Sequence, residues 1–514
     1  MALGNKKTFC ILLLIIALAC FFRLYHLDSV PPGIYADEAM NANEAAISPG
    51  KLFYESNNGR EGLFVNLIAL SFSVFGISIW SFKLISALAG TATVMGIYLL
   101  GKETFKRNEA GLLAAFFLAV SFWHVNFSRT GFRAILVPLV MSFSFYLLLK
   151  GIRTGKMSNF AIAGIVFGLG FHTYISFRLA VLILPLFLAA FLWCRFKNRG
   201  QFKKSLVASA VFLAFIFLVA LPIGVYFLQN PDSFISRATG VSIFSQDNPI
   251  YSFLKSLGAH LAMFNFYGDS NWRHNFSGEP QLYWPVGILF LMGLWVSVKK
   301  LVSSFKSKDE QELGAYVLLL SWLFIMLLPG ILTYEGVPHA LRTIGSVIPA
   351  YLLAGLGAWK TYLFLSKKVK NRALFVLTCW LFIAAVAFIQ FDKYFFDWGQ
   401  KPEVKAAFNK DYTEIGRYLN SLPEETEKYV IVNELDSPLY GISIPGQTPM
   451  FIERTEYGRL RADYITAKDL DKIKTDGPTV IIPLYDKGME EELKERFNNI
   501  KIEEKEYFKS YIIP

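Results

Sequence analysis

The chain has 514 residues, of which 54% are hydrophobic and 18% charged, and its mean hydropathy is +0.40. This balance excludes an ordinary soluble domain of this length, which would carry more polar residues. The formal net charge of +11 would suit a nucleic-acid partner, but Lys and Arg fall between hydrophobic stretches, as in the cytoplasmic loops of a membrane protein, so we expect no nucleic acid.

Eleven apolar stretches predict transmembrane helices, because a helix needs ~20 mainly apolar residues to cross a bilayer. We read the first as an uncleaved span rather than a signal peptide, since no small-residue cleavage site follows it. In chain order the stretches are residues 8–24, 84–101, 109–127, 134–149, 159–173, 179–194, 205–228, 284–298, 313–333, 341–359 and 373–391.

One further apolar stretch, residues 63–79, is ambiguous, and the positive-inside rule decides its placement. If it crossed the membrane, the basic clusters from Lys102 onward would lie outside; if it lies in the interface, every cluster lies inside. We therefore expect an interfacial helix, a cytoplasmic N-terminus and an extracytoplasmic C-terminus. The clusters lie at residues 6–7, 102–107, 150–156, 195–204, 299–308 and 360–372.

The predicted fold class is an α-helical polytopic membrane protein with about 11 transmembrane helices, interfacial helices in its outer loops and a C-terminal extracytoplasmic α/β domain. We expect it in the cell (plasma) membrane. The membrane part covers residues 1–392, with outer loops at 25–83 and 229–282, and the domain covers residues 393–514. Residues 251–266 read as a second interfacial helix. In the domain we expect helices over 413–422 and 489–497, strands over 429–432, 450–452 and 479–484, and a short β pair near the end.

An acidic pair follows the first span, in the segment Tyr35-Ala36-Asp37-Glu38-Ala39. A carboxylate placed there can act as a general base toward an acceptor hydroxyl. The pair could instead be a solvated cap of a short helix, and its position alone leaves both interpretations open. Asp37 and Glu38 are the candidate catalytic residues.

Basic side chains recur in three short loops on the predicted outer side, where they oppose the usual bias. Arginine forms bidentate contacts with phosphate oxygens, so this recurrence beside His and Tyr favours a shared anion site. Snorkelling to lipid headgroups is the alternative for any single arginine. Candidate phosphate-binding residues are Arg129, Arg133, Arg178 and Arg342, with His172, Tyr174 and His339 as candidate substrate-binding neighbours.

A polar loop from Gly268 to Pro280 suits contact with a hydroxylated ligand, although it could be only a turn held against the membrane. Arg60 and Glu61 could join the site or form an ion pair at the start of the interfacial helix. His124, near the outer end of the third span, reads as a helix-contact histidine. The loop's candidate substrate-binding residues are Asp269, Asn271, Arg273 and His274.

Acidic residues on the predicted outer side raise the question of a metal. Carboxylate oxygens are the ligands that Mg²⁺ and Ca²⁺ prefer. No ligand spacing marks a metal site, so a divalent cation is left open and no metal ligands are assigned. The carboxylates concerned are those of Asp37, Glu38, Glu61 and Asp269.

The Asp37-Glu38 pair in a long first outer loop, followed by a predicted interfacial helix, resembles the C-type polytopic membrane glycosyltransferases. Within these the chain is similar to the protein O-mannosyltransferase and lipid A aminoarabinose transferase group, that is, dolichyl-phosphate-mannose-protein mannosyltransferase-like. The Phe75-Gly76 turn ahead of the second span and the Ser128-Arg129 to Arg133 segment after the third carry the same likeness. It covers roughly residues 8–390.

The resemblance implies a polyprenyl-phosphate-linked sugar donor, no nucleotide, and an acidic residue of the first loop at the acceptor. Asp37 would then be the catalytic carboxylate, Glu38 its neighbour, and Arg129, Arg133 and Arg178 would lie near the donor phosphate. The sequence departs from the family's pattern at two places, and both bear on which acceptor is used and how the donor is bound. Ala134-Ile135 stands where members often carry an aspartate, and Arg60-Glu61-Gly62 replaces a Pro-Pro entry to the interfacial helix.

The hypothesis is inverting transfer of a sugar from a polyprenyl phosphate to an extracytoplasmic hydroxyl of a protein, lipid or cell-wall glycan. Membrane lipids are further expected partners. The first alternative is a transporter or flippase of lipid-linked sugars, which would place binding groups near the membrane midplane and show internal repeats. The second is a non-catalytic subunit whose outer domain binds cell-wall polymer. Polar groups gathered at one face, without an evident repeat, favour the enzyme.

Overall fold

The computed structural model of the chain describes residues 4–234, 240–307, 309–432, 439–485 and 488–514. Part of the predicted second outer loop (235–239) and position 308 of a basic cluster lie outside these residues. The chain divides into two compact units: unit 1 comprises Met1–Tyr25 and Ser86–Phe396, and unit 2 comprises His26–Ile85 and Asp397–Pro514. The first predicted outer loop therefore forms one compact unit with the C-terminal residues.

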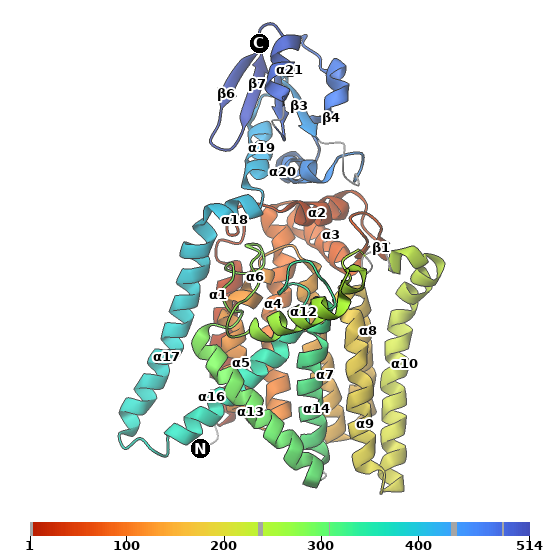
Figure 1. Ribbon diagram of the computed structural model, residues 1–514, viewed down its shortest axis with the longest axis vertical. Helices are drawn as coiled ribbons and strands as arrows, with labels where there is room; N and C mark the ends of the chain where they lie inside the picture. The colour runs from red at the N-terminus through yellow and green to blue at the C-terminus, as the bar shows by residue number, and fades with distance from the viewer. Residues whose placement is uncertain (1–3, 235–239, 308, 433–438, 486–487) are drawn as a thin grey trace. The chain divides into compact units, whose positions relative to one another are not determined.

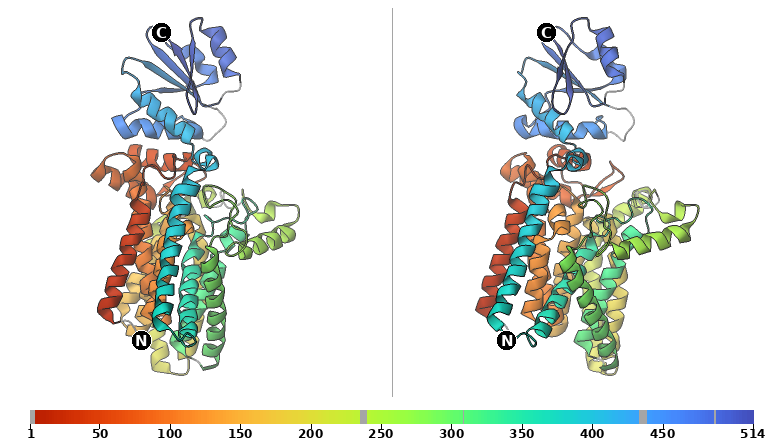
Figure 2. Two further views of the ribbon diagram at one scale, coloured as in Figure 1. Left: turned by 90° about the vertical axis from the view of Figure 1, so that its left-hand side faces the viewer. Right: turned by 60° about the vertical axis from the view of Figure 1, so that its left-hand side comes forward.

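Unit 1 is a bundle of helices that run side by side (Figures 1 and 2). Among the described residues, nine helical segments are long and apolar enough to cross a membrane, some with an adjoining 3-10 turn. They are built on α1 (Asn5–Leu24), α4 (Ile79–Phe105), α7 (Leu136–Thr154), α9 (Ile183–Arg195), α10 (Arg199–Gln229), α13 (Trp284–Ser307), α14 (Glu310–Ile325), α16 (Val347–Leu365) and α17 (Arg372–Asp392).

The other two predicted spans are also helical but shorter. α5 (Asn108–Val120) and α8 (Met157–Leu169) have 13 residues each, or ~20 Å at 1.5 Å per residue. α5 stops at Ser121, whose hydroxyl accepts the N–H of His124 and starts α6 (Phe122–Phe127). α8 continues as the 3-10 turn Gly170–His172. The predicted fold class, a polytopic helical protein with a C-terminal α/β part, is confirmed.

The ambiguous apolar stretch forms α3 (Leu63–Phe75), which ends at Gly76 with φ at 77°. Thirteen residues span ~20 Å, less than the ~30 Å hydrocarbon core. Residues 63–79 are therefore not one full span, and their position in the interface stays a prediction. The helix predicted at 251–266 is α12 (Pro249–Ala262), which runs across the bundle of unit 1 rather than along it (Figures 1 and 2).

Glycines let two helices of the bundle touch through their backbones. A Cβ at Gly293 of α13 would lie 1.8 Å from the carbonyl oxygen of Leu353 in α16, and a Cβ at Gly357 would lie 1.9 Å from that of Leu289. Small residues at a helix crossing are a usual device of membrane bundles, because they allow close van der Waals packing.

Unit 2 contains a five-stranded sheet of order β4-β3-β5-β7-β6. β3 runs parallel to β4 and β5, whereas β7 is antiparallel to β5 and β6. The strands are β3 (Glu427–Val432), β4 (Asp463–Thr466), β5 (Thr479–Pro483), β6 (Lys501–Glu504) and β7 (Lys509–Ile513).

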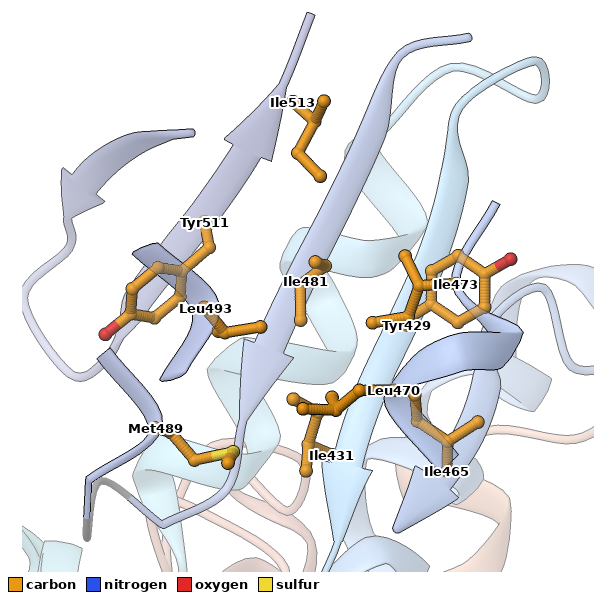
Figure 3. Packing of buried hydrophobic residues seen from close by; sticks show 10 residues of the cluster. All are labelled: Tyr429, Ile431, Ile465, Leu470, Ile473, Ile481, Met489, Leu493, Tyr511 and Ile513. Carbon is orange, nitrogen blue, oxygen red and sulfur yellow. The ribbon is translucent and has the colours of Figure 1, made fainter. Parts of the chain in front are cut away.

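Both faces of this sheet are covered, which explains the apolar run of the interior strand β3. Tyr429 and Ile431 of β3 point to the face packed by α21 (Met489–Arg496) and the 3-10 turn Ala467–Lys472 (Figure 3). The alternate β3 residues, Val430 and Val432, join Ile415 and Leu419 of α19 (Lys410–Ser421) in a second cluster.

The elements predicted in this region are confirmed with one exception. Residues 450–452, predicted as a strand, lie inside helix α20 (Gln447–Tyr457), so that prediction is wrong. Three adjacent apolar residues cannot separate a strand from a buried helix. β4 was not predicted.

Buried hydrogen bonds tie α2 (Ala36–Ile47) to the C-terminal part of unit 2. The fully buried amide of Asn43 donates to the main-chain oxygen and to Oε1 of Gln447, both at 3.0 Å. Thr448 Oγ1 donates to the carbonyl of Ile34 at 3.1 Å, and the N–H of Ile34 donates to Thr413 Oγ1 at 3.1 Å. The helix that carries the acidic pair is thus anchored on residues near the other end of the chain.

Candidate functional site

The acidic pair lies in the first turn of α2, in unit 2, and its two members differ. Glu38 is fully buried, and its Oε2 accepts the N–H of Tyr35 at 3.1 Å, closing the helix N-terminus. Asp37 stays partly exposed, and its Oδ1 accepts Nδ2 of Asn57 at 2.8 Å. Glu38 therefore stabilises the helix end, while the Asp37 carboxylate remains accessible for chemistry.

A short hairpin brings Asn57 to this carboxylate. β1 (Phe53–Tyr54) pairs antiparallel with β2 (Arg60–Glu61). The connecting loop turns at Asn57, Asn58 and Gly59, with φ of 51°, 60° and 81°. Asn and Gly are the residues that tolerate this left-handed conformation, so the sequence itself specifies the turn.

Arg60 is buried inside unit 2. Its Nη2 lies 2.5 Å from Oε2 of Glu44, its Nη1 donates to Asn41 Oδ1 at 2.6 Å, and only 1% of its side chain is exposed. Glu61, 2% exposed, pairs with Phe53 in the hairpin. Both were predicted to contact substrate, and the structure places them in the interior that supports the loop carrying Asn57.

A second polar cluster lies in unit 1, on two loops. Oδ2 of Asp269 lies 3.0 Å from Nδ1 of His274 and 3.9 Å from Nδ1 of His339. The same oxygen accepts the N–H of Ala340 at 2.8 Å, and Oδ1 accepts the N–H of Asn271, also at 2.8 Å. Asp269, Asn271, His274 and His339 were predicted as substrate contacts, and the structure brings them together.

Helix α6 holds both of these loops. Nδ2 of Asn126 donates to the carbonyl of Arg273 at 2.7 Å, and Nε1 of Trp123 donates to the carbonyl of Ala340 at 3.2 Å. The ring of Phe127 lies 5.8 Å from that of His274. Sequence reasoning missed Trp123 and Asn126, because nothing in the chain marks their partners.

His124 makes a helix contact, as its sequence position predicts. Its Nδ1 lies 2.8 Å from Nη2 of Arg23 in α1, and both side chains are fully buried. Arg23 also donates to the carbonyl of Ala119 at 2.9 Å.

The predicted phosphate-binding arginines all lie in unit 1 but in different settings. Arg129 is fully buried, donates to the carbonyl of Phe22 at 3.0 Å and lies 4.8 Å from the ring of Phe395, so it packs α1 against the turn after α17. Arg133 lies 5.1 Å from the ring of Tyr174, so these two predicted residues meet.

The remaining candidates make contacts within the protein, two of them to distant segments and one within its own loop. Arg178 donates to the carbonyl of Phe234 at 2.9 Å, and Arg342 lies 3.1 Å from the carboxylate of Glu335. Nε2 of His172 donates to the carbonyl of Val219 at 2.9 Å. These contacts show ordered loops; the assignment of the arginines to a phosphate stays a prediction.

Comparison with known proteins indicates the class of protein to which this fold corresponds. Residues 63–224, about a third of the chain, match the protein family described as dolichyl-phosphate-mannose-protein mannosyltransferase. The Bacillus subtilis (strain 168) protein YkcB, provisionally named a mannosyltransferase, is 30% identical over 221 residues. That alignment covers 41% of this chain and 30% of the relative, so the chain matches less than a third of that protein's length.

Solved structures share the fold. ArnT from Cupriavidus metallidurans, bound to undecaprenyl phosphate, superposes with a TM-score of 0.56 at 12% identity over 97% of both chains. The apo oligosaccharyltransferase of Archaeoglobus fulgidus gives 0.55 at 14% identity, covering 88% of this chain and 64% of that one. The chain therefore has the fold of the GT-C membrane glycosyltransferases. The segment that matches the mannosyltransferase family, residues 63–224, is part of this fold. The resemblance seen in the sequence is confirmed.

Proposed function

We propose that this protein transfers a sugar from a polyprenyl phosphate to a hydroxyl of an extracytoplasmic acceptor, with inversion at the anomeric carbon. The observation that carries the proposal is the Asp37 carboxylate, which stays partly exposed in the first turn of α2 while Glu38 is used by the helix cap. The GT-C fold and the mannosyltransferase family match support it.

In the proposed step Asp37 accepts the proton of the acceptor hydroxyl as its oxygen attacks the anomeric carbon. The bond from that carbon to the phosphate oxygen breaks, and the polyprenyl phosphate leaves with the electron pair. Two features orient the Asp37 carboxylate: it lies beside the N–H groups at the start of α2, and it accepts the bond from Asn57.

The leaving phosphate needs positive charge, because charge develops on its oxygens as the bond breaks. We assign this task first to Arg133, whose guanidinium rests over Tyr174, with Arg178 and Arg342 as further candidates. ArnT is described as bound to undecaprenyl phosphate, which supports a lipid phosphate as the donor's carrier here. The distribution of Lys and Arg supports an extracytoplasmic location for the site and for the C-terminal residues.

The test is turnover of a panel of polyprenyl-phosphate sugars by the purified full chain, measured as released polyprenyl phosphate. We expect Asp37→Asn to lower release at least ~100-fold, since general base catalysis contributes roughly 10²–10⁴. Asp28→Asn is the matched control, because Asp28 is an exposed acid of the same segment. Full activity of Asp37→Asn would refute the role of the carboxylate, and no release from any donor would refute the reaction.

A further inference from the structure

The Asp269 cluster of unit 1 carries an inference independent of the proposed transfer reaction. One carboxylate oxygen of Asp269 and one imidazole nitrogen each of His274 and His339 lie within 4.8 Å of one another. Asp269 and His274 are 2% and 5% exposed. Buried ionisable groups so close together need a common partner or a proton to share.

Hydrogen bonds around His339 indicate which of its nitrogens carries a proton. The N–H of Arg342 points to Nδ1 of His339 at 3.4 Å, so Nδ1 is an acceptor there. The lone pair of Nδ1 and the Asp269 oxygen, 3.9 Å apart, then face each other without a proton between them.

The backbone of His339 is itself fixed by a buried histidine. Nδ1 of His260 donates to the carbonyl of Ser256 at 2.8 Å, which leaves its Nε2 to accept the N–H of His339 at 3.2 Å. On the other side Phe132 and Phe127 enclose the ring of His274. The three donors are therefore held in place by a rigid, largely apolar shell, as in metal sites whose outer contacts orient the ligands.

We propose that Asp269, His274 and His339 bind one divalent transition-metal ion of the Zn²⁺ type. Two imidazoles and a carboxylate are a donor set that suits Zn²⁺ and leaves a coordination position for water or substrate. Ligand atoms ~2.1 Å from such an ion lie about 3.4 Å apart in tetrahedral geometry. The two Asp269–histidine separations, 3.0 and 3.9 Å, bracket that value, and all three ligand atoms lie within 4.8 Å of one another. The ion joins the loop after α12 to the loop before α16.

Without an ion, the same residues form an Asp269–His274 hydrogen bond with His339 beside it. When the ion binds, His274 gives its Nδ1 lone pair to the metal and carries its proton on Nε2. The net charge of the imidazole is unchanged by that step. The two states differ in metal content, so the alternatives can be separated without reference to catalysis.

The experiment uses the full chain in detergent, treated with chelator, dialysed and reloaded with Zn²⁺. We expect about one Zn²⁺ per chain by elemental analysis, and a rise in the thermal midpoint on reloading. His274→Ala and His339→Ala should each weaken Zn²⁺ binding at least roughly tenfold. His26→Ala is the matched control, because His26 is an exposed histidine of unit 2, and it should bind as the parent does.

Replacing Zn²⁺ by Co²⁺ gives a second readout, a visible absorption band that reports nitrogen and oxygen ligation. It remains informative where an alanine variant folds poorly, because it is recorded on the unaltered chain. Binding below about 0.1 ion per chain, without a Co²⁺ band, would overturn the proposal. Unchanged binding in both histidine variants would show adventitious metal elsewhere and would overturn it equally.

Discussion

In unit 2 the guanidinium of Arg60 lies 2.5 Å from the carboxylate of Glu44, and both side chains are almost completely buried. Ser56 completes the arrangement by donating to Glu44 and accepting from Arg60. The pair joins the β1–β2 hairpin to α2. It therefore fixes the loop that carries Asn57 against the helix that carries Asp37.

Breaking this pair should destabilise unit 2 strongly, because removal of either partner takes a counter-charge away from a buried charge. We expect Glu44→Ala and Arg60→Ala each to lower the free energy of unfolding by about 3–5 kcal/mol. The double variant should cost clearly less than the sum. Denaturant unfolding in detergent measures these values, with Glu425→Ala as an exposed control in the same unit. Additive losses would show that the two side chains do not interact.

The acidic pair should separate into a structural and a chemical member. Glu38→Ala removes the acceptor of the Tyr35 N–H and should cost about 1 kcal/mol of stability. Glu38→Gln keeps an acceptor oxygen and should cost less. Asp37→Asn should leave the unfolding transition in place while abolishing transfer. The assignment fails if Glu38→Gln, in a folded protein, loses as much activity as Asp37→Asn.

A buried carboxylate in α20 should make stability depend on pH. Burial raises the pKa of Glu453 above 4.5, although Tyr464 and the N–H groups of Arg461 and Ala462 donate to it. Between pH 4.5 and this raised pKa, Glu453 therefore keeps its proton in the folded chain but has released it in the unfolded chain. Stability should therefore fall as pH rises through 4.5 toward the folded pKa.

Glu453→Gln tests this dependence, because the amide oxygen can accept both N–H groups while its NH₂ faces the Tyr464 hydroxyl. Thermal midpoints of the full chain between pH 4 and 7 should fall with pH in the parent and change less in this variant. Equal slopes in the two proteins would assign the pH dependence to other groups.

The close crossing of α13 and α16 should not tolerate a methyl group. Gly293→Ala and Gly357→Ala place a Cβ within 1.9 Å of a carbonyl oxygen of the other helix. Overpacking of this kind costs typically 1–3 kcal/mol. Gly224→Ala in α10 is the control, because a Cβ there has nothing within 4 Å. Unfolding midpoints in detergent should drop only for the two crossing variants.

Much of the fold could be predicted because membrane helices are long apolar runs, and Lys and Arg gather between them. All eleven predicted spans are helical, and the break near Gly76 follows from its left-handed backbone. The strand predicted at 450–452 was wrong because a three-residue run carries no periodicity. Among the described residues nine segments, rather than eleven, are long enough to cross a membrane, because Ser121 interrupts one helix and another ends in a 3-10 turn.

The site was only partly accessible to prediction. The position of Asp37 followed from the chain, but the use of Glu38 as a cap depends on the local geometry of Tyr35. Asn57 could have been noticed through its Asn-Asn-Gly turn signal. No sequence pattern relates His339 to Asp269, which lies in a separate loop, and none identifies Glu44 as the partner of Arg60.

Unit 2 is assembled from two stretches of chain that are far apart in the order of synthesis. Asn43 leaves the ribosome 404 residues before its partner Gln447, a delay of roughly 20–80 s at 5–20 residues per second. During that time α2 has no C-terminal partner to cover it. A protein shortened before Asp397 would leave that surface of α2 permanently bare. The segment that carries the proposed base therefore reaches its final form only after the last part of the chain has been made.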